Sequence, residues 1–141
     1  MGPEDNKAIA RRLIEALNRG DIDGVAQHFA PDYVDHALPP GSPPGPEGFK
    51  QFFGLLRMAF PDFRYTLEDE VAEGDMLVHR LTGHGTMKGE FQGMPPTGKH
   101  AEWSEMHLAR ISNGKVMEHW AVVDQLDMLQ KLGLMPQAQP G

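Results

Sequence analysis

The first sixty residues place hydrophobic side chains at helical spacing. Residues 4–18 carry one apolar stripe, and Gly20 suits the left-handed end of such a helix. Asp21 suits the cap of a short second helix, and Pro46 suits the first turn of a third helix that runs to Phe60. The three apolar faces consist of Ile9, Leu13, Ala16 and Leu17, then Ile22, Val25, Ala26 and Phe29, then Phe49, Phe52, Phe53, Leu56 and Phe60. The pattern therefore predicts three N-terminal helices, each with one face to bury.

After the third helix the hydrophobic period changes to two, which is typical of β-strands. We expect strands at residues 33–37, 63–72, 76–87, 100–112 and 115–125. The segment 84–99 is rich in Gly and Pro and predicts a long loop or bent hairpin, and Asp127 is suited to cap a final helical turn that ends at Gly133. Helices followed by antiparallel strands indicate an α+β domain, in which the helices cover one face of the sheet and leave a cavity. Residues 1–135 form this single domain, and residues 136–141 are expected to be a flexible tail.

The last predicted hairpin is the most informative part of the chain. Ser112-Asn113-Gly114 is a turn signal that would place Ile111 opposite Val116. An uninterrupted register then pairs His107 with Trp120, Glu105 with Val122, and Trp103 with Asp124. These side chains would share one face, and His119 and Arg110 would fall on the other. Titratable groups beside an indole on one strand pair indicate a pocket wall.

Composition excludes several classes of function. The chain has 141 residues, a formal net charge of -7 and no cysteine. The acidic balance argues against nucleic acid and anionic membranes as partners, and without cysteine there is no disulfide or thiol nucleophile. The N-terminus lacks the features of a signal peptide, and no stretch approaches the roughly 20 apolar residues of a membrane span, so we expect a cytoplasmic protein.

Short motifs along almost the whole chain resemble the SnoaL-like polyketide cyclase family, within the nuclear-transport-factor-2-like superfamily. The similar pieces, in order, are residues 18–21, 29–36, 45–49, 59–63, 73–75, 85–86, 89–99, 114–115, 118–120, Asp124 and 132–133. The resemblance implies a cone-shaped barrel of a curved, mostly antiparallel sheet covered by three N-terminal helices. It also implies a homodimer, a hydrophobic small-molecule ligand, and chemistry without metal or organic cofactor. The fold alone does not name a reaction, because it hosts enzymes and binding domains.

Asp124 and His107 are the expected catalytic residues. Asp124 ends an apolar strand, and apolar surroundings raise the pKa of a carboxylate and make it a better general base near neutral pH. The resemblance supports this role, and the alternative is that Asp124 only caps the helical turn after it. His107 would stabilise a substrate oxyanion, by analogy with the related steroid isomerases, or it would be a structural histidine.

Four further residues are expected to bind substrate: Trp120, His36, Glu105 and Trp103. A flat indole such as that of Trp120 suits a polycyclic or aromatic ligand, and the alternative is a core tryptophan. Glu105 would orient His107 or face water at the sheet edge, and His36 would face the cavity mouth or pack under the proline-rich loop. No metal site is expected, because His79 and His84, and likewise His100 and His107, are an odd number of residues apart and fall on opposite strand faces.

Three functions remain open from the sequence. The first is a cyclase-type enzyme that abstracts a proton next to a carbonyl and closes a ring by intramolecular aldol reaction, or a related isomerase or dehydratase. The second is a non-catalytic domain that binds a hydrophobic small molecule. The third is an epoxide hydrolase of the same fold, for which Arg80, Glu105 and Asp124 are the only carboxylate–arginine–carboxylate set. Burial of Asp124 in a closed cavity would favour catalysis, whereas contact with backbone amides would favour a cap.

Overall fold

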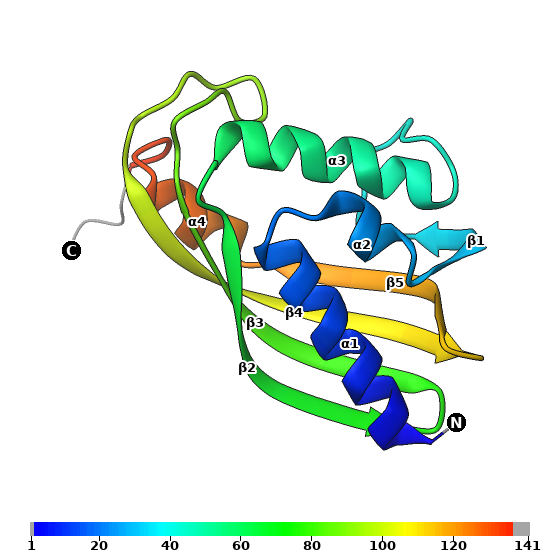
Figure 1. Cartoon of the computed structure of the whole chain (residues 1–141). Coiled ribbons are helices and arrows are strands. Elements are labelled where there is room, and N and C mark those ends of the chain that lie inside the picture. The colour runs from blue at the N-terminus through cyan, green and yellow to red at the C-terminus, as the bar shows by residue number, and fades with distance from the viewer. Residues whose placement is uncertain (1, 137–141) are drawn as a thin grey trace.

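The computed structural model describes residues 2–136 as four helices and five strands (Figure 1). The helices are α1 (Pro3–Asn18), α2 (Ile22–Ala26), α3 (Pro46–Ala59) and α4 (Gln125–Lys131). The strands are β1 (Phe29–Asp35), β2 (Arg64–Glu73), β3 (Met76–Thr86), β4 (His100–Ser112) and β5 (Lys115–Val123). Of the predicted tail at 136–141, residues 137–141 lie outside the described part. Within that part, no helix combines the length and hydropathy needed to cross a membrane.

Local signals set the helix boundaries as the sequence predicts. The Asp21 carboxylate accepts a hydrogen bond from the backbone N–H of Gly24 at 2.9 Å, which caps α2. Pro46 occupies the first turn of α3, where its missing N–H has no helical partner to lose. Of the two caps considered for the last helix, Asp124 provides the cap of α4, and Asp127 lies in the first turn.

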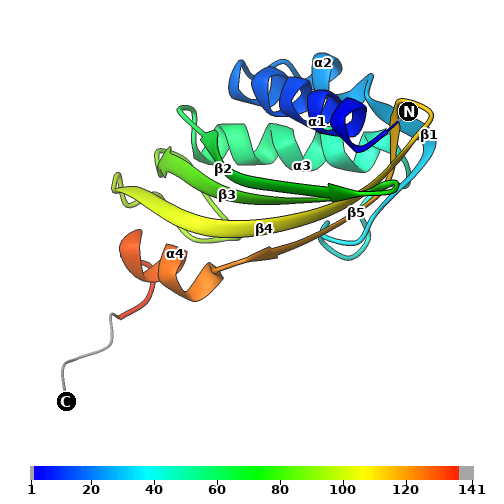
Figure 2. The ribbon, with the colours of Figure 1, turned by 90° about the horizontal axis from the view of Figure 1, so that it is seen from below.

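The five strands form one curved sheet in the order β1-β5-β4-β3-β2. All neighbouring strands are antiparallel except β1 and β5, which are parallel. Figure 2 shows α1, α2 and α3 on one face of the sheet and α4 on the opposite side. The predicted α+β fold, with a mostly antiparallel sheet under three N-terminal helices, is thus confirmed, although the described strands form an open sheet and not a closed barrel.

The predicted register of the last hairpin was wrong over most of its length. Ile111 does lie opposite Val116, but the next pair is Arg110 with Glu118, so Met117 is an extra residue in β5. This bulge shifts the rest of the strand by one position, and the pairs become Leu108 with Trp120, His107 with Ala121, and Glu105 with Val123. Because side chains alternate along a strand, a one-residue shift exchanges the two faces. His119 therefore moves to the face under the helices, which we call the inner face, and Trp120 moves to the outer face.

Candidate active site

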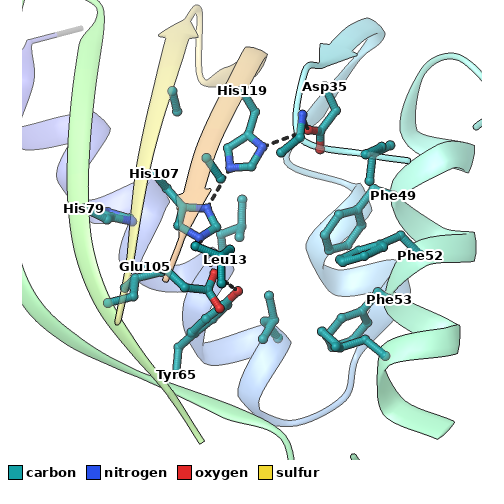
Figure 3. A pocket seen from close by; sticks show the side chains of 18 of the residues that line it. Leu13, Asp35, Phe49, Phe52, Phe53, Tyr65, His79, Glu105, His107 and His119 are labelled. Carbon is teal, nitrogen blue, oxygen red and sulfur yellow. Dashed lines mark hydrogen bonds and ion pairs between the residues drawn. The ribbon is translucent and has the colours of Figure 1, made fainter. Parts of the chain in front are cut away.

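A cavity of about 440 Å³ lies between the helices and the inner face of the sheet. Its helix side is apolar, and Figure 3 shows Phe49, Phe52 and Phe53 of α3 facing the strands across it. The sheet side is polar along one line, where carboxylates and histidines from β1, β4 and β5 come together. A volume of this size and an apolar lining with a few convergent polar groups are typical of small-molecule sites.

The polar line is a continuous chain of hydrogen bonds. Asp35 Oδ1 lies 3.0 Å from His119 Nδ1, His119 Nε2 lies 2.7 Å from His107 Nδ1, and His107 Nε2 lies 2.7 Å from Glu105 Oε1. Strand pairing holds these residues in place. Asp35 pairs with His119 across β1 and β5, and Glu105 and His107 are two residues apart on β4, so their side chains share its inner face. We call this set, Asp35, His119, His107 and Glu105, the inner relay.

Glu105 is held at one end of the inner relay by two further donors. The Tyr65 hydroxyl donates to Oε1 and the Trp103 indole N–H donates to Oε2, both at 2.7 Å. Burial by itself raises the pKa of Glu105, but the hydrogen bond and charge of His107, with the Tyr65 and Trp103 donors, lower it overall. The indole fits here because Gly83 lies beneath it: a Cβ on Gly83 would come within 2.6 Å of Trp103 Nε1. Glu105 is therefore a buried, ionised carboxylate in a fixed position.

Asp35 is held in the same way at the other end. The Tyr33 hydroxyl donates to Oδ2 at 2.6 Å, and the backbone N–H of Ala37 donates to Oδ1 at 2.9 Å. Burial raises the pKa of Asp35, and the hydrogen bonds and charge of His119 and the Tyr33 and Ala37 donors outweigh it, so that the pKa falls below its ordinary value. The pKa of Tyr33 and that of Tyr65 are raised, first by burial and then by the neighbouring carboxylate, so both hydroxyls stay protonated donors.

The geometry limits where protons can lie along the inner relay. Each carboxylate accepts a hydrogen bond from the nearer ring, which assigns one proton to His119 Nδ1 and one to His107 Nε2. The two remaining ring nitrogens face each other at 2.7 Å, where two lone pairs would repel. A hydrogen bond between the rings needs a proton on one of these two nitrogens, and which nitrogen carries it depends on the tautomers. Such a pair can release a proton at one ring and accept one at the other.

His79 of β3 lies beside the inner relay and lines the same cavity. Its Nε2 donates to Glu70 Oε2 at 2.9 Å, and Arg11 lies 3.0 Å from the other Glu70 oxygen. Burial, followed by the charges of His107, His119 and Arg11, lowers the pKa of His79 to about 4. His79 is thus neutral at neutral pH and adds no positive charge next to the histidine pair.

The structure brings three of the six expected site residues together. His107, Glu105 and Trp103 line the cavity. Asp124 does not belong to its wall: the carboxylate is exposed and accepts a hydrogen bond from the backbone N–H of Asp127 at 3.3 Å. The expected apolar surroundings of Asp124 were therefore wrong, and its position is that of a helix cap.

Trp120 and His36 lie on the outer face because of the bulge at Met117. Their rings stack with centroids 4.9 Å apart, and His36 Nε2 lies 2.6 Å from Glu118 Oε2. Arg110 contacts the same carboxylate from β4. The expectation that Trp120 and His36 face the cavity was wrong, since neither belongs to its lining.

Sequence reasoning missed His119 and Asp35. His119 was assigned to the opposite face, because a bulge leaves no unambiguous mark in the sequence. Asp35 did carry a signal, because Tyr33 and Asp35 are two residues apart on one strand and must share a face. The partner that gives this pair meaning, His119, is 84 residues away in the sequence.

Comparison with known proteins places the chain in a family. The model of the SnoaL-like polyketide cyclases matches residues 7–132, and the chain belongs to this family. It is 32% identical over 128 residues to the aklanonic acid methyl ester cyclase DnrD of Streptomyces peucetius, with 89% of this chain and 88% of that protein covered. It is also 32% identical over 123 residues to the nogalonic acid methyl ester cyclase of Streptomyces nogalater, covering 86% of this chain and 92% of that protein.

Solved structures show the same architecture. IdmH from Streptomyces antibioticus superposes with a TM-score of 0.81 at 34% identity, covering 91% of this chain and 98% of that chain. TsrD from Streptomyces laurentii superposes with a TM-score of 0.88 at 25% identity, covering 96% and 99%. The resemblance drawn from the sequence motifs is therefore confirmed.

Proposed function

We propose that this protein is a cyclase that closes a ring in a hydrophobic carbonyl substrate by intramolecular aldol reaction, with its own side chains as acid and base. The observation that carries the proposal is the inner relay: two histidine rings 2.7 Å apart, each hydrogen-bonded to a buried carboxylate, in the wall of an apolar cavity. Proton abstraction next to a carbonyl needs a positioned base and a donor for the developing oxyanion, and the relay offers both.

The proposed substrate is a polyketide ester of the type named for the curated relatives. Those relatives are called aklanonic or nogalonic acid methyl ester cyclases. The aromatic side chains of α3 suit a flat, apolar ligand, and the cavity volume suits a small molecule held in a folded conformation. Burial in such a cavity keeps water away from the enolate and brings the reacting carbons together.

Substrate atoms enter the inner relay at the contact between its two rings. The imidazole side chains are each 18% exposed, whereas the Asp35 and Glu105 side chains are 4% and 6% exposed. The facing nitrogen of one histidine takes the proton from the activated carbon, and the other ring, kept protonated by its carboxylate, donates a hydrogen bond to the enolate oxygen. The enolate carbon then attacks a second carbonyl of the same molecule, and the new alkoxide takes up a proton from the relay. One carbon–hydrogen bond breaks, and one carbon–carbon bond and one oxygen–hydrogen bond form at the expense of a carbonyl double bond. The reaction is therefore an isomerisation that needs no oxidant or reductant.

Epoxide hydrolysis, the third function considered from the sequence, is not supported. Arg80 lies on the outer face, opposite Met106, and pairs with Asp69 at 2.5 Å. Glu105 lies on the inner face and Asp124 caps α4. The three residues that this reaction would need do not meet.

Proton exchange in heavy water tests the proposal. The protein would be incubated with cyclic and aromatic β-dicarbonyl compounds, and NMR would follow loss of the α-proton signal. We expect wild type and Asp124→Asn to catalyse exchange and His119→Ala to lose it. Exchange that survives in His119→Ala but disappears in Asp124→Asn would return the base to Asp124. Binding without exchange in the wild type would favour the alternative of a non-catalytic binding domain.

We also propose a homodimer formed through the outer face of the sheet, in the cytoplasm. Apolar side chains are exposed there, among them Met106 at 48% and Val122 at 74%. Exposed apolar patches of this kind are typical of interaction sites. Sedimentation of wild type against Val122→Glu tests it, with a shift from dimer to monomer expected.

A further inference from the structure

A second group of polar side chains lies outside the cavity, where β3 ends and β4 begins. His84 pairs with Glu102 across the two strands, and His100 lies two residues before Glu102 on the same face of β4. One potential ligand atom from each of the three residues lies within 4.8 Å of the others. None of the three lines the cavity. We call this set the outer cluster.

His84 has an unusual environment for a buried histidine. Only 7% of the residue is exposed, and Nε2 lies 2.9 Å from Thr66 Oγ1. Nδ1 lies 2.8 Å from Glu102 Oε1, but the oxygen is out of line with the ring, so Nδ1 has no aligned hydrogen-bond partner among the described residues. A buried ring nitrogen beside a carboxylate, without a well-directed hydrogen bond, is a position that a cation can fill.

His100 is oriented by a chain of hydrogen bonds of its own. The Thr86 hydroxyl has one proton and donates it to Asp62 Oδ2 at 2.7 Å. Thr86 Oγ1 therefore accepts from His100 Nδ1–H at 2.9 Å, which leaves the lone pair of this ring on Nε2. Metal-binding histidines commonly have one ring nitrogen fixed by such a second partner, which sets the tautomer.

We propose that His84, His100 and Glu102 bind a divalent transition-metal ion, and that Zn²⁺ is the ion that this donor set fits best. Two imidazoles and one carboxylate are ligands that zinc accepts, whereas Ca²⁺ and Mg²⁺ prefer oxygen ligands alone. The side chains of His84 and Glu102 are 8% and 60% exposed, so the site has one buried ligand and an open side where water completes the coordination. No metal was expected from the sequence, because histidines of the same strand fall on opposite faces. The outer cluster instead joins His84 of β3 to His100 of the neighbouring strand β4.

The alternative reading is an ordinary ion pair between protonated His84 and Glu102. The chain offers a matched control for it, because His36 and Glu118 form a similar pair on the same face of the sheet, with 2.6 Å between Nε2 and Oε2. No third ligand joins that pair in any metal-binding group found among residues 2–136. A nonspecific His–carboxylate affinity would therefore show at both places, whereas a built site would show only at the outer cluster.

Zinc titration of the chelator-treated full-length protein tests the proposal, with a chromophoric indicator to read free Zn²⁺. We expect one saturable site per chain, with affinity lowered at least about tenfold in His100→Gln and Glu102→Gln and unchanged in His36→Gln. These two substitutions are at more exposed positions than His84, so loss of folding is not a concern there, and far-UV circular dichroism checks it. His84→Gln should behave alike if it folds.

Three results would overturn the proposal. They are the absence of saturable binding to wild type, equal affinity in wild type and in His100→Gln and Glu102→Gln, and binding that is lost in His119→Gln but kept in His100→Gln. The last result would place the ion in the cavity and not at the outer cluster. Because the readout is metal affinity and not turnover, the outcome is independent of the cyclase proposal.

Discussion

The two faces of one sheet carry the same kinds of side chain in different surroundings. On the inner face, His119 and His107 lie between Asp35 and Glu105, and both carboxylates are nearly fully buried. On the outer face, His36 lies against Glu118 and Trp120, and its side chain is 42% exposed. An exposed ion pair is screened by water and contributes little, whereas the hydrogen bonds of a buried network are stronger because the local dielectric is low. Residue type therefore does not distinguish the proposed catalytic histidines from His36; the face on which each histidine lies does.

One residue decides which histidine is on which face. The bulge at Met117 turns His119 inward and Trp120 outward, and without it the two would exchange places. The face on which His119 and Trp120 lie, and with it their exposure to water, is thus set by the bulge at Met117. The regular alternation of side chains along the strand does not decide it alone.

The largest expected difference between the faces is in catalysis. His107→Ala should lower the rate of α-proton exchange by about 10²- to 10⁴-fold, because it removes one half of the proton-transferring pair. His36→Ala should leave the rate unchanged, since its ring lies on the outer face. The exchange rate of both variants at equal protein concentration checks this, and equal losses in the two would remove the distinction between the faces.

The second difference is a pH dependence of stability that comes from His79. Its folded pKa is about 4, below the ordinary value of 6.5. Between these values the unfolded chain binds a proton that the folded protein does not, so stability falls as the pH falls from about 6.5 to 4, by at most about 1.4 kcal/mol per pH unit.

Urea unfolding at several pH values measures this slope. His79→Gln should flatten this dependence of unfolding free energy on pH. An identical slope in wild type and His79→Gln would show that His79 is not held neutral by the fold.

Glu105→Gln should lower the free energy of unfolding by about 1–3 kcal/mol at pH 7, because a buried, charge-assisted acceptor is replaced. The folded pKa of Glu105 is lowered, so the stability that it contributes is present above its ordinary pKa of 4.5 and is lost as the pH falls through the folded value. The difference between wild type and Glu105→Gln should therefore shrink below about pH 4.5. A difference that stays constant down to pH 3 would contradict an ionised Glu105.

The smallest expected effect is at Asp124. Asp124→Ala should cost about 1 kcal/mol of stability through loss of the helix cap, and Asp124→Asn only a few tenths, since asparagine caps equally well. Thermal unfolding of the two variants measures the difference. A large loss of stability in Asp124→Asn would show that the carboxylate charge has a role beyond capping.

Much of the fold could be predicted from the sequence because its signals are local. The cap at Asp21, Pro46 in the first turn of α3, the turn at 112–114 and the change of period near residue 63 each depend on neighbouring residues. The family motifs added the curved sheet under three helices. A closed barrel was expected, but the described sheet is open. Closure would depend on contacts between the two edge strands, β1 and β2, and no local sequence signal reports such contacts.

The site could be predicted only in part, and the reason is register. Trp103, Glu105 and His107 follow one another at a spacing of two residues in one strand, so the sequence shows that they share a face. Ile111 lies opposite Val116 as expected, but the expectations beyond that pair, for Trp120 and for Asp124, failed because Met117 interrupts the pairing. His119 and Asp35 come together through the parallel pairing of β1 with β5, which no local sequence pattern predicts.

¹⁵N NMR of the imidazole rings tests most directly whether His107 and His119 share a proton inside the cavity, as the proposed mechanism requires. Near neutral pH we expect His107 Nδ1 and His119 Nε2 to show shifts between those of protonated and unprotonated nitrogens, with a low-field proton signal that is lost in His119→Ala. Two ordinary neutral rings in the wild type, with no such proton, would contradict the account.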